Sequence, residues 1–486
     1  MAASVHDVSG VKTKFAWSSE NDAENIGNLW DDFAQSTGFH GVNKIVLMRT
    51  FKLRCIWWTF AVLLMSAYMS YNITQELMNY YRYPVITNTK VEVREELPFP
   101  AITFCNLSPF NLTAVKEADP YMENYFNGVS LLGSFNGAIN WSDPGYGSTF
   151  SEGQSLDWWK KILMKPSQML TLCIMKGSWC LAALKPVVTN MGHCTIFNWN
   201  ASDVAKVRVT GFDNNLIIFA NIHHDKYVLG SQMAAGLRVI LHDPRIHPDV
   251  ATSSFVAAPG TSTYAAVKRS TFKYLPAPYK SFENRTCVDT LSPTFNNTLE
   301  YHDIYTYETC LQECITRITF NKCGCVKPSD DGTIGKICSI IEVYTCYAPT
   351  YGSISQNPDV HTECGCQIPC TFDTYETKVS FSKYPSNVTI KYIIDLGFGE
   401  DEAFIRDNIL EIRIYYENLM LQVTEQSPQY TTETIIGNLG GQMGICLGAS
   451  ILTITELVEF FLTLCMSIFK KIRSGGKRKR IKPTKN

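Results

Sequence analysis

The stretch Gly437-Asn-Leu-Gly-Gly-Gln-Met-Gly-Ile-Cys-Leu-Gly-Ala-Ser450 decides the fold, and it runs directly into the apolar segment 451–469. Glycines weaken helices and suit positions where backbones approach closely or leave helical geometry. The apolar segment is typical of a membrane span, yet it carries Glu456 and Glu459. A carboxylate near the centre of a bilayer costs several kcal/mol unless it faces water or a partner. We therefore predict one wall of a cation pore here rather than a lipid anchor.

A second apolar segment, Cys55 to Ile73, contains nineteen residues without an Asp, Glu, Lys or Arg. It is long enough to cross a hydrocarbon core of about 30 Å. The first twenty residues lack an apolar stretch ending in a small-residue cleavage site, so we expect an uncleaved anchor. Basic residues, which accumulate on the cytoplasmic side, precede this span and follow the other one. We therefore predict a plasma-membrane protein with two spans and both termini inside the cell.

This topology divides the chain into five parts. We place the boundaries at 1–54 for a cytoplasmic segment, 55–73 for the first span, 74–433 for an extracellular domain, 434–469 for the second span with the pore, and 470–486 for a basic cytoplasmic tail. The net charge of −2 gives no bulk attraction to nucleic acid.

The cysteines and the glycosylation triplets agree with this topology. Fourteen of the seventeen cysteines lie between the spans, and an even number in an extracellular segment predicts a disulfide framework, here of seven bridges. Candidate glycosylation sites in Asn-x-Ser/Thr triplets lie in the same segment, at Asn106, Asn111, Asn140, Asn200, Asn284, Asn296 and Asn387. None falls in either predicted cytoplasmic end.

Part of the disulfide pairing follows from spacing. Cys310 and Cys314 share one face of a plausible helix, and Cys364 and Cys366 share one face if their segment is extended. An antiparallel arrangement joins 310 to 366 and 314 to 364. Continuing the same nesting pairs Cys287 with Cys370, Cys323 with Cys346, and Cys325 with Cys338. Spacing alone leaves other connectivities open, and a zinc site around 364–370 is the competing interpretation.

The outer segment predicts a mixed α+β domain. Apolar alternation favours strands at Val204–Val209, Leu216–Ile222 and Leu237–His242, and one strand from Glu411 to Val423. Helical patterns occur at Leu156–Leu163 and Asp401–Leu410.

The whole pattern resembles the superfamily of degenerins, epithelial sodium channels and acid-sensing ion channels. The motifs that carry the resemblance are His40-Gly41, Phe99-Pro-Ala-Ile-Thr-Phe-Cys-Asn106, Gly192-His-Cys-Thr-Ile-Phe-Asn198, Tyr274-Leu-Pro-Ala-Pro-Tyr279, the cysteine ladder, Gly440-Gly-Gln-Met-Gly444 and Gly448-Ala-Ser450. The short acid-sensing, bile-acid-sensitive and peptide-gated members are the most similar. The resemblance implies a hand-shaped outer domain and a homotrimeric or heterotrimeric sodium channel, usually blocked by amiloride.

The resemblance also assigns roles to residues of this sequence. It implies a selectivity filter at Gly448, Ala449 and Ser450, a gate position at Gly437, and a cytoplasmic re-entrant gating element at His40 and Gly41. It adds the disulfides Cys105–Cys194 and Cys173–Cys180 to the ladder. It further implies that Tyr80 or Tyr81 couples the outer domain to the pore through Tyr279, where the family usually has tryptophan.

Two interpretations compete for the glycine face. Gly437, Gly441, Gly444 and Gly448 recur at spacings of four, three and four. Such a face suits either a pore lining or close packing against another helix of the bundle. An interrupted helix at 448–450 favours the pore, because it can aim carbonyls and the Ser450 hydroxyl at a dehydrating ion.

Glu456 and Glu459 begin a polar stripe that continues through Thr463 and Ser467. The alternative is that these acids pair with basic residues of the other span, but 55–73 offers none. Glu456 lies about 21 Å of helix from Lys470, too far for its side chain to reach the inner surface. We predict an acidic ring in the cytoplasmic vestibule.

The opening stimulus is the least determined property. Acid-gated members usually carry histidines outside the first span, and this chain has none there. We favour an extracellular neuropeptide or small molecule, with protons as the alternative. No cofactor is expected; Na⁺ is the permeant ion, and extracellular Ca²⁺ and H⁺ are candidate modulators. A non-conducting disulfide-rich receptor is the alternative of another class, and no catalytic motif suggests an enzyme.

Overall fold

The structure is a computed structural model. It describes residues 26–47, 52–129, 139–140, 142–146, 150, 155–189, 191–199, 203–212, 215–229, 233–248, 254–282, 285–327 and 335–475. The chain divides into two compact units. The membrane unit consists of Met1–Pro84 and Pro428–Asn486, and the outer unit is Val85–Ser427.

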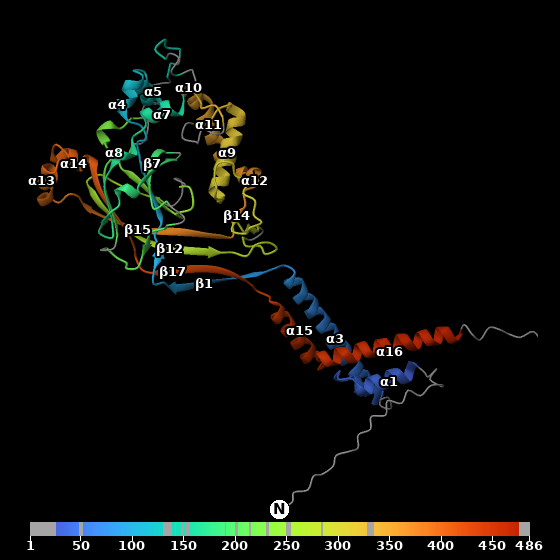
Figure 1. Cartoon of the computed structure of the whole chain (residues 1–486). Coiled ribbons are helices and arrows are strands. Elements are labelled where there is room, and N and C mark those ends of the chain that lie inside the picture. Colours follow the sequence, from blue (N-terminus) through green and yellow to red (C-terminus); the bar gives the residue numbers. More distant parts are fainter. Residues whose placement is uncertain are drawn as a thin grey trace, which may run out of the picture. The chain divides into compact units, whose positions relative to one another are not determined.

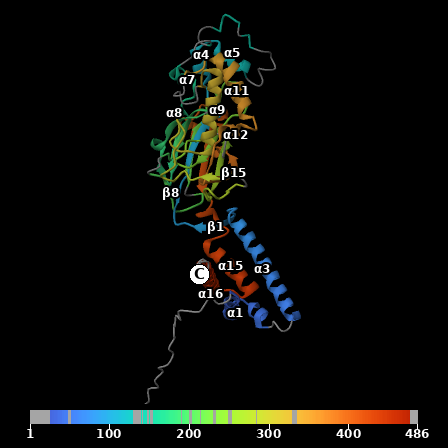
Figure 2. The same ribbon diagram turned by 90° about the vertical axis from the view of Figure 1, so that its right-hand side faces the viewer.

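The elements that lie wholly within the described part of the membrane unit are helices (Figure 1). Its helices are α1 (Ile26–Ser36), α2 (Val42–Leu47), α3 (Lys52–Tyr80), α15 (Thr432–Leu447) and α16 (Ile451–Gly475). Figures 1 and 2 both show α3 running beside α15, and the two helices are in contact. Two segments are long and apolar enough to cross a membrane, Lys52–Tyr80 and Ile451–Phe469.

Both candidate spans present apolar side chains outward, as lipid-facing helices do. In α3 no residue is buried, and Trp57 is 68% exposed. The helix is longer than the predicted 55–73 segment, because nothing breaks it before Tyr80, and 29 residues extend about 43 Å. It therefore continues past the apolar stretch and includes Glu76.

Two β-sheets form the centre of the outer unit. The larger sheet has the order β1-β17-β12-β16-β9-β4-β5, with β15 also paired to β12, and the smaller has the order β11-β10-β3-β7-β6. Their strands are β1 (Val85–Val93), β3 (Ala101–Asn106), β4 (Leu170–Met175), β5 (Ser178–Trp179), β6 (Lys185–Thr189), β7 (Gly192–Phe197), β9 (Leu216–Asn221), β10 (Leu237–His242), β11 (Ser254–Ala257), β12 (Thr261–Lys273), β15 (Thr371–Lys383), β16 (Ile409–Tyr416) and β17 (Met420–Pro428). Two short pairs complete the strands: β2 (Leu97–Pro98) with β8 (Lys206–Val207), and β13 (Cys287–Val288) with β14 (Ile368–Pro369).

The main core contains residues of both sheets, among them Phe104, Ile218, Val239 and Tyr416. Strand β9 shows why one face of the sheet contributes to this core: its residues alternate between buried and half-buried positions along the strand. The Tyr416 ring is buried in this core, and its hydroxyl donates to the Pro98 carbonyl (2.8 Å).

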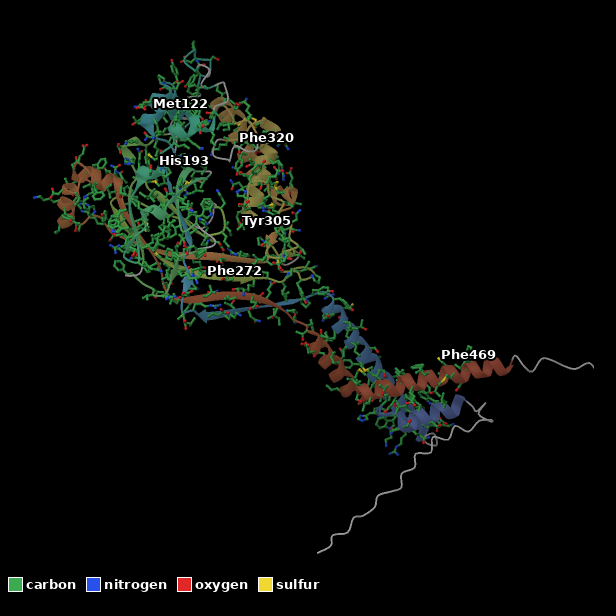
Figure 3. The ribbon with its side chains drawn as sticks, in the orientation of Figure 1. Met122, His193, Phe272, Tyr305, Phe320 and Phe469 are labelled. Carbon is green, nitrogen blue, oxygen red and sulfur yellow. A yellow bond between two sulfur atoms is a disulfide. The ribbon has the colours of Figure 1, made fainter. Side chains whose placement is uncertain are left out.

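Helices surround this sheet core on several sides (Figures 1 and 2). They are α4 (Leu112–Ala118), α5 (Met122–Val129), α7 (Leu156–Ile162), α8 (Pro166–Met169), α9 (Tyr307–Cys323), α10 (Ile340–Glu342), α11 (Ala348–Ser355), α12 (Val360–Cys364), α13 (Asn387–Asp395) and α14 (Glu402–Asn408). Met122, labelled in Figure 3, belongs to a separate core of α4, α5 and α7.

Most predicted elements of the outer unit form, with three differences. The predicted strand Val204–Val209 is reduced to β8 (Lys206–Val207), and the predicted helix at 401–410 ends at Asn408, where β16 begins. The predicted helices at 156–163 and 401–410 begin after the N-caps Ser155 and Asp401. The segment 411–423 is two strands rather than the predicted one, because the chain bends at 417–419. The strands β16 and β17 still run in the same direction, both parallel to β12. The Asn418 side chain accepts from the Met420 N–H and stabilises the bend.

The structure contains seven disulfides, and they join the seven pairs given by the ladder and the resemblance. Cys310 and Cys314 lie on α9 as expected. Their partners differ from the predicted extended segment, because Cys364 ends helix α12 and Gly365 follows with a left-handed φ of 60°. The end of α12 therefore places the Cys364 and Cys366 sulfurs beside α9, as the predicted extended segment would have done.

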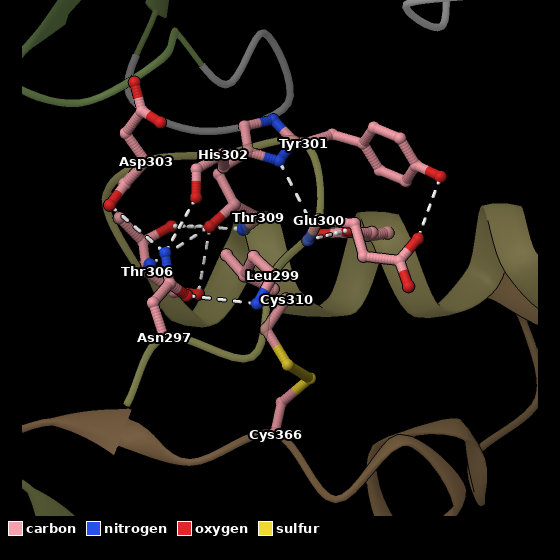
Figure 4. Close-up of polar contacts among 11 residues, drawn as sticks. Asn297, Leu299, Glu300, Tyr301, His302, Asp303, Thr306, Thr309, Cys310 and Cys366 are labelled. Atoms are coloured by element: carbon pink, nitrogen blue, oxygen red, sulfur yellow. Dashed lines mark hydrogen bonds and ion pairs between the residues drawn. A yellow bond between two sulfur atoms is a disulfide. The ribbon is translucent and has the colours of Figure 1, made fainter. Parts of the chain in front are cut away.

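The loop before α9 is held by buried polar contacts (Figure 4). Thr306 caps the helix, and the Glu300 N–H donates to Glu313 Oε1 at 2.6 Å. His302 Nδ1 lies 3.7 Å from Glu313 Oε2. Tyr305 donates to the Gln367 carbonyl, so the loop is joined to the segment after Cys366 (Figure 3).

Candidate functional site

The second span is interrupted at Gly448-Ala-Ser450. Helix α15 ends at Leu447, and Gly448 adopts a left-handed φ of 65°, which an L side chain rarely adopts. The Gly448 N–H donates to the Gly444 carbonyl, and the Ala449 N–H donates to the Met443 carbonyl. These bonds occupy the Met443 and Gly444 carbonyls, and with the left-handed Gly448 they form a C-capping motif that ends α15.

The next helix has its own start signal. The Ser450 hydroxyl accepts from the Thr453 N–H (3.4 Å), and the Thr453 hydroxyl accepts from the Ser450 N–H (3.1 Å). This reciprocal capping fixes where α16 begins. The interruption predicted from sequence is therefore present, with one cap on each side of Ala449.

The N-terminal segment lies against this break. The His40 N–H donates to the Leu447 carbonyl at 2.8 Å. A Cβ placed on Gly448 would lie only 2.3 Å from His40 Nδ1. Gly41 has a φ of 90°, and a Cβ there would lie 2.9 Å from Val62 Cγ2. Glycines are therefore required at both positions, and His40-Gly41 joins the break in the second span to α3.

Glu456 has partners in the same N-terminal segment. Its Oε2 accepts from the Gly38 N–H (2.9 Å) and from the Thr37 hydroxyl (3.2 Å). Glu456 therefore has a backbone N–H and a hydroxyl as partners, rather than the basic residue weighed as the alternative. Glu459 is exposed, and the acidic ring remains a prediction for both acids.

Aromatic packing joins α1 to α16. The Phe33 and Phe460 ring centroids lie 4.5 Å apart, and Trp30 lies 6.1 Å from Phe460. Such pairs stabilise by about 1 kcal/mol beyond the buried area. Thr37, Gly38 and this aromatic pair were not predicted from the sequence. The available signal was that Trp30 and Phe33 lie three residues apart and so share one helix face.

The glycine face of α15 is open. A Cβ added at Gly437, Gly440, Gly441 or Gly444 would meet no atom within 4 Å in the described part of the chain. Close packing against another helix of the same chain is therefore not their role. The face is free for a lumen or for a neighbouring copy.

The three coupling residues lie in different units. Tyr80 and Tyr81 are at the end of α3, with ring centroids 5.4 Å apart. Tyr279 belongs to the outer unit, where its N–H donates to the Pro276 carbonyl. Coupling through these tyrosines remains a prediction.

One candidate glycosylation site is contradicted by its burial. Asn106 is only 2% exposed, its Nδ2 donates to the Ile222 carbonyl (2.8 Å), and Tyr227 donates to its Oδ1. A glycan on that nitrogen would break this core contact, so the prediction at Asn106 is wrong. Asn140, Asn296 and Asn387 are exposed and Asn111 is half-buried, whereas Asn200 and Asn284 lie outside the described residues.

Comparison with known proteins agrees with this arrangement. The family model described as amiloride-sensitive sodium channel matches residues 33–460. Acid-sensing ion channel 4-B of Danio rerio is 26% identical over 451 residues, covering 90% of this chain and 77% of that protein. Acid-sensing ion channel 1 of Gallus gallus is 27% identical, covering 88% of this chain and 82% of that protein. The bile acid-sensitive ion channel of Mus musculus is 26% identical, covering 89% and 87%.

A solved proton-activated chloride channel overlaps 84% of this chain and 97% of that one with 6% identity and a TM-score of 0.33, too weak a likeness to bear on the fold. The family model covers most of the chain, from α1 to the middle of α16, and it confirms the resemblance. The chain therefore belongs to the amiloride-sensitive sodium channel family: it is a plasma-membrane ion channel with two candidate spans, and not an enzyme.

Proposed function

We propose that this chain forms a homotrimeric or heterotrimeric, sodium-selective and amiloride-blocked channel that an extracellular ligand opens. The observation that carries the proposal is the interrupted second span. A complete helix break follows Gly437, Gly440, Gly441 and Gly444, where an added Cβ would meet no atom of the described residues within 4 Å. Two spans cannot enclose an aqueous path, because a lumen needs several walls. Rotational assembly of three copies supplies those walls and places the open glycine faces together.

Within such an assembly, Gly448, Ala449 and Ser450 form the filter. The helix ending leaves carbonyls near the break that no longer belong to a regular helix, and such carbonyls can replace the water of a dehydrating ion. The His40-Gly41 segment holds the break from the cytoplasmic side of the chain and serves as the gating element. Glu459 adds negative charge below it.

The ligand favoured for opening is a small molecule or a neuropeptide. The bile acid-sensitive relative shows that a member of this family can respond to a small organic molecule, as its name states. Protons are the second candidate, because other relatives are named acid-sensing.

Gly437→Phe is expected to produce a constitutive, amiloride-blocked sodium current without any ligand. In the described part of the chain no atom lies within 4 Å of a Cβ at this position, so the side chain starts in open space and its ring is expected to crowd neighbouring copies. In the assembly it holds the glycine faces apart. Two-electrode recording in oocytes, with sodium replaced by a large organic cation, measures the current.

Gly352→Phe is the matched control. Gly352 lies on α11 in the outer unit, has no left-handed φ, and an added Cβ there would meet no atom of the described residues within 4 Å, so this variant should behave as the native chain does. If Gly437→Phe reaches the surface and carries no sodium current, the non-conducting receptor becomes the better interpretation.

A further inference from the structure

An ordered row of basic side chains lies at the β2–β8 pair of the outer unit, labelled β8 in Figure 2. The pairing is antiparallel and places Pro98 opposite Lys206 and Leu97 opposite Val207. Val207 is fully buried, so Lys206 and Arg208, on either side of it, share the outer face of the strand. Glu96 lies at the same edge, and both basic side chains contact its carboxylate, at 2.6 Å and 3.1 Å.

A third cation comes from the β4–β5 hairpin. Lys176 occupies the turn with a left-handed φ of 51°, followed by Gly177 at 77°. Such turns prefer asparagine or glycine at the first position, so turn chemistry does not account for a lysine there. Its ammonium donates to the Lys206 backbone carbonyl and so stands beside the basic row.

The charges at this site do not balance. Three cations surround one carboxylate, and hydrogen bonds from Lys206 and Arg208 lower the pKa of Glu96, so it is ionised at neutral pH. In the described ranges Lys176 contacts no carboxylate. The exposed pair Lys378–Glu417, by contrast, has one acid for one base. The site therefore carries an excess of two positive charges.

The backbone that carries these groups is fixed. The Asn198 side chain donates to the Phe99 carbonyl (2.7 Å) and accepts from the Ala205 N–H (2.8 Å). The Phe99 N–H donates to the Ala205 carbonyl at 2.7 Å. These contacts join the segment before β8 to the segment after β2. A preorganised basic site loses less conformational freedom when an anion binds.

The four charged groups and Val209 line a cavity of about 470 Å³. This volume lies in the range of small-molecule sites, roughly 300 to 1,000 Å³. Val209 is 58% exposed and gives the cavity an apolar wall beside the cations. We propose that the cavity bounded by Glu96, Lys176, Lys206, Arg208 and Val209 binds an amphipathic organic anion, a carboxylate or sulfonate with an apolar body. That this anion opens the channel rests on the function proposed above.

The test measures binding of 1-pyrenebutyrate, a fluorescent carboxylate, to the full-length chain in nanodiscs. Fluorescence anisotropy reports the binding, and the signal from empty nanodiscs is subtracted. Uncharged 1-pyrenebutanol is the matched probe. We expect the double variant Lys206→Gln/Arg208→Gln to weaken pyrenebutyrate binding at least tenfold and to leave pyrenebutanol unchanged. Glu96→Gln removes the competing carboxylate and should tighten binding about threefold, a gain that a damaged fold cannot produce. Lys378→Gln should have no effect.

Pyrenebutyrate binding that is absent, or equal in all four proteins, overturns the proposal. A second outcome also overturns the proposal: native mass spectrometry shows that the double variant is monomeric where the native chain is assembled, and probe binding is unchanged. Lys206 and Arg208 would then contact a neighbouring copy rather than an anion. The outcome is separable from the proposed function. If pyrenebutyrate binding changes in the variants as expected but Gly437→Phe carries no current, only the proposed channel function is refuted. If Gly437→Phe carries a current but pyrenebutyrate binding is the same in all variants, only the proposed anion site is refuted.

Discussion

Gly448→Ala is expected to abolish the sodium current, even when it is combined with Gly437→Phe so that no ligand is needed. Alanine at a φ of 65° costs about 1–2 kcal/mol on backbone grounds alone. Its Cβ would also lie 2.3 Å from His40 Nδ1, so the N-terminal segment must move away from the break. That movement removes the bond from the His40 N–H to the Leu447 carbonyl.

The measurement is amiloride-blocked current per channel at the surface, with surface protein quantified by biotinylation. Gly352→Ala is the matched control, because the same methyl group is added on α11 of the outer unit, where no atom of the described residues lies within 4 Å. Alanine is the better helix former, so this control should conduct normally. A normal current from Gly448→Ala would show that the break is not part of the ion pathway.

Local sequence signals predicted a large part of this fold. The break at Gly448, the helix starts at Ser155 and Asp401, and the strands β9 and β10 each depend on residues within one turn or one strand. Such signals are read correctly from the sequence because neighbouring residues decide them.

The errors occurred where distant residues decide the outcome. Asn106 lies in a triplet that predicts a surface loop, but β3 is a central strand of its sheet and buries it. Cys364 and Cys366 are two apart, which suits a strand, yet the helix α12 reaches Cys364 and only the left-handed Gly365 redirects the chain. Glu456 accepts from a backbone N–H 418 residues away, and a backbone N–H has no signature in a sequence.

The contact at Glu456 leads to a prediction that separates two roles for this acid. Glu456→Ala removes the acceptor of the Gly38 N–H and the Thr37 hydroxyl, whereas Glu456→Gln keeps an oxygen in place and removes only the charge. A hydrogen bond to a charged group contributes about 1.5–3 kcal/mol, so release of the N-terminal segment in the alanine variant is expected to lower open probability at least tenfold. Glutamine should have a clearly smaller effect, and Thr37→Val, which removes one of the two donors, should be intermediate.

Single-channel recording in the Gly437→Phe background measures open probability and conductance separately. If Glu456 anchors the N-terminal segment, its variants change open probability and leave conductance as it is. If Glu456 lines the lumen, it attracts cations and its variants change conductance. Glu459→Gln is the comparison, because Glu459 is exposed one turn further along α16 and should lower conductance alone. Equal losses of conductance in Glu456→Gln and Glu456→Ala, with open probability unchanged, would return Glu456 to the acidic ring and leave the contact with Gly38 without a role in gating.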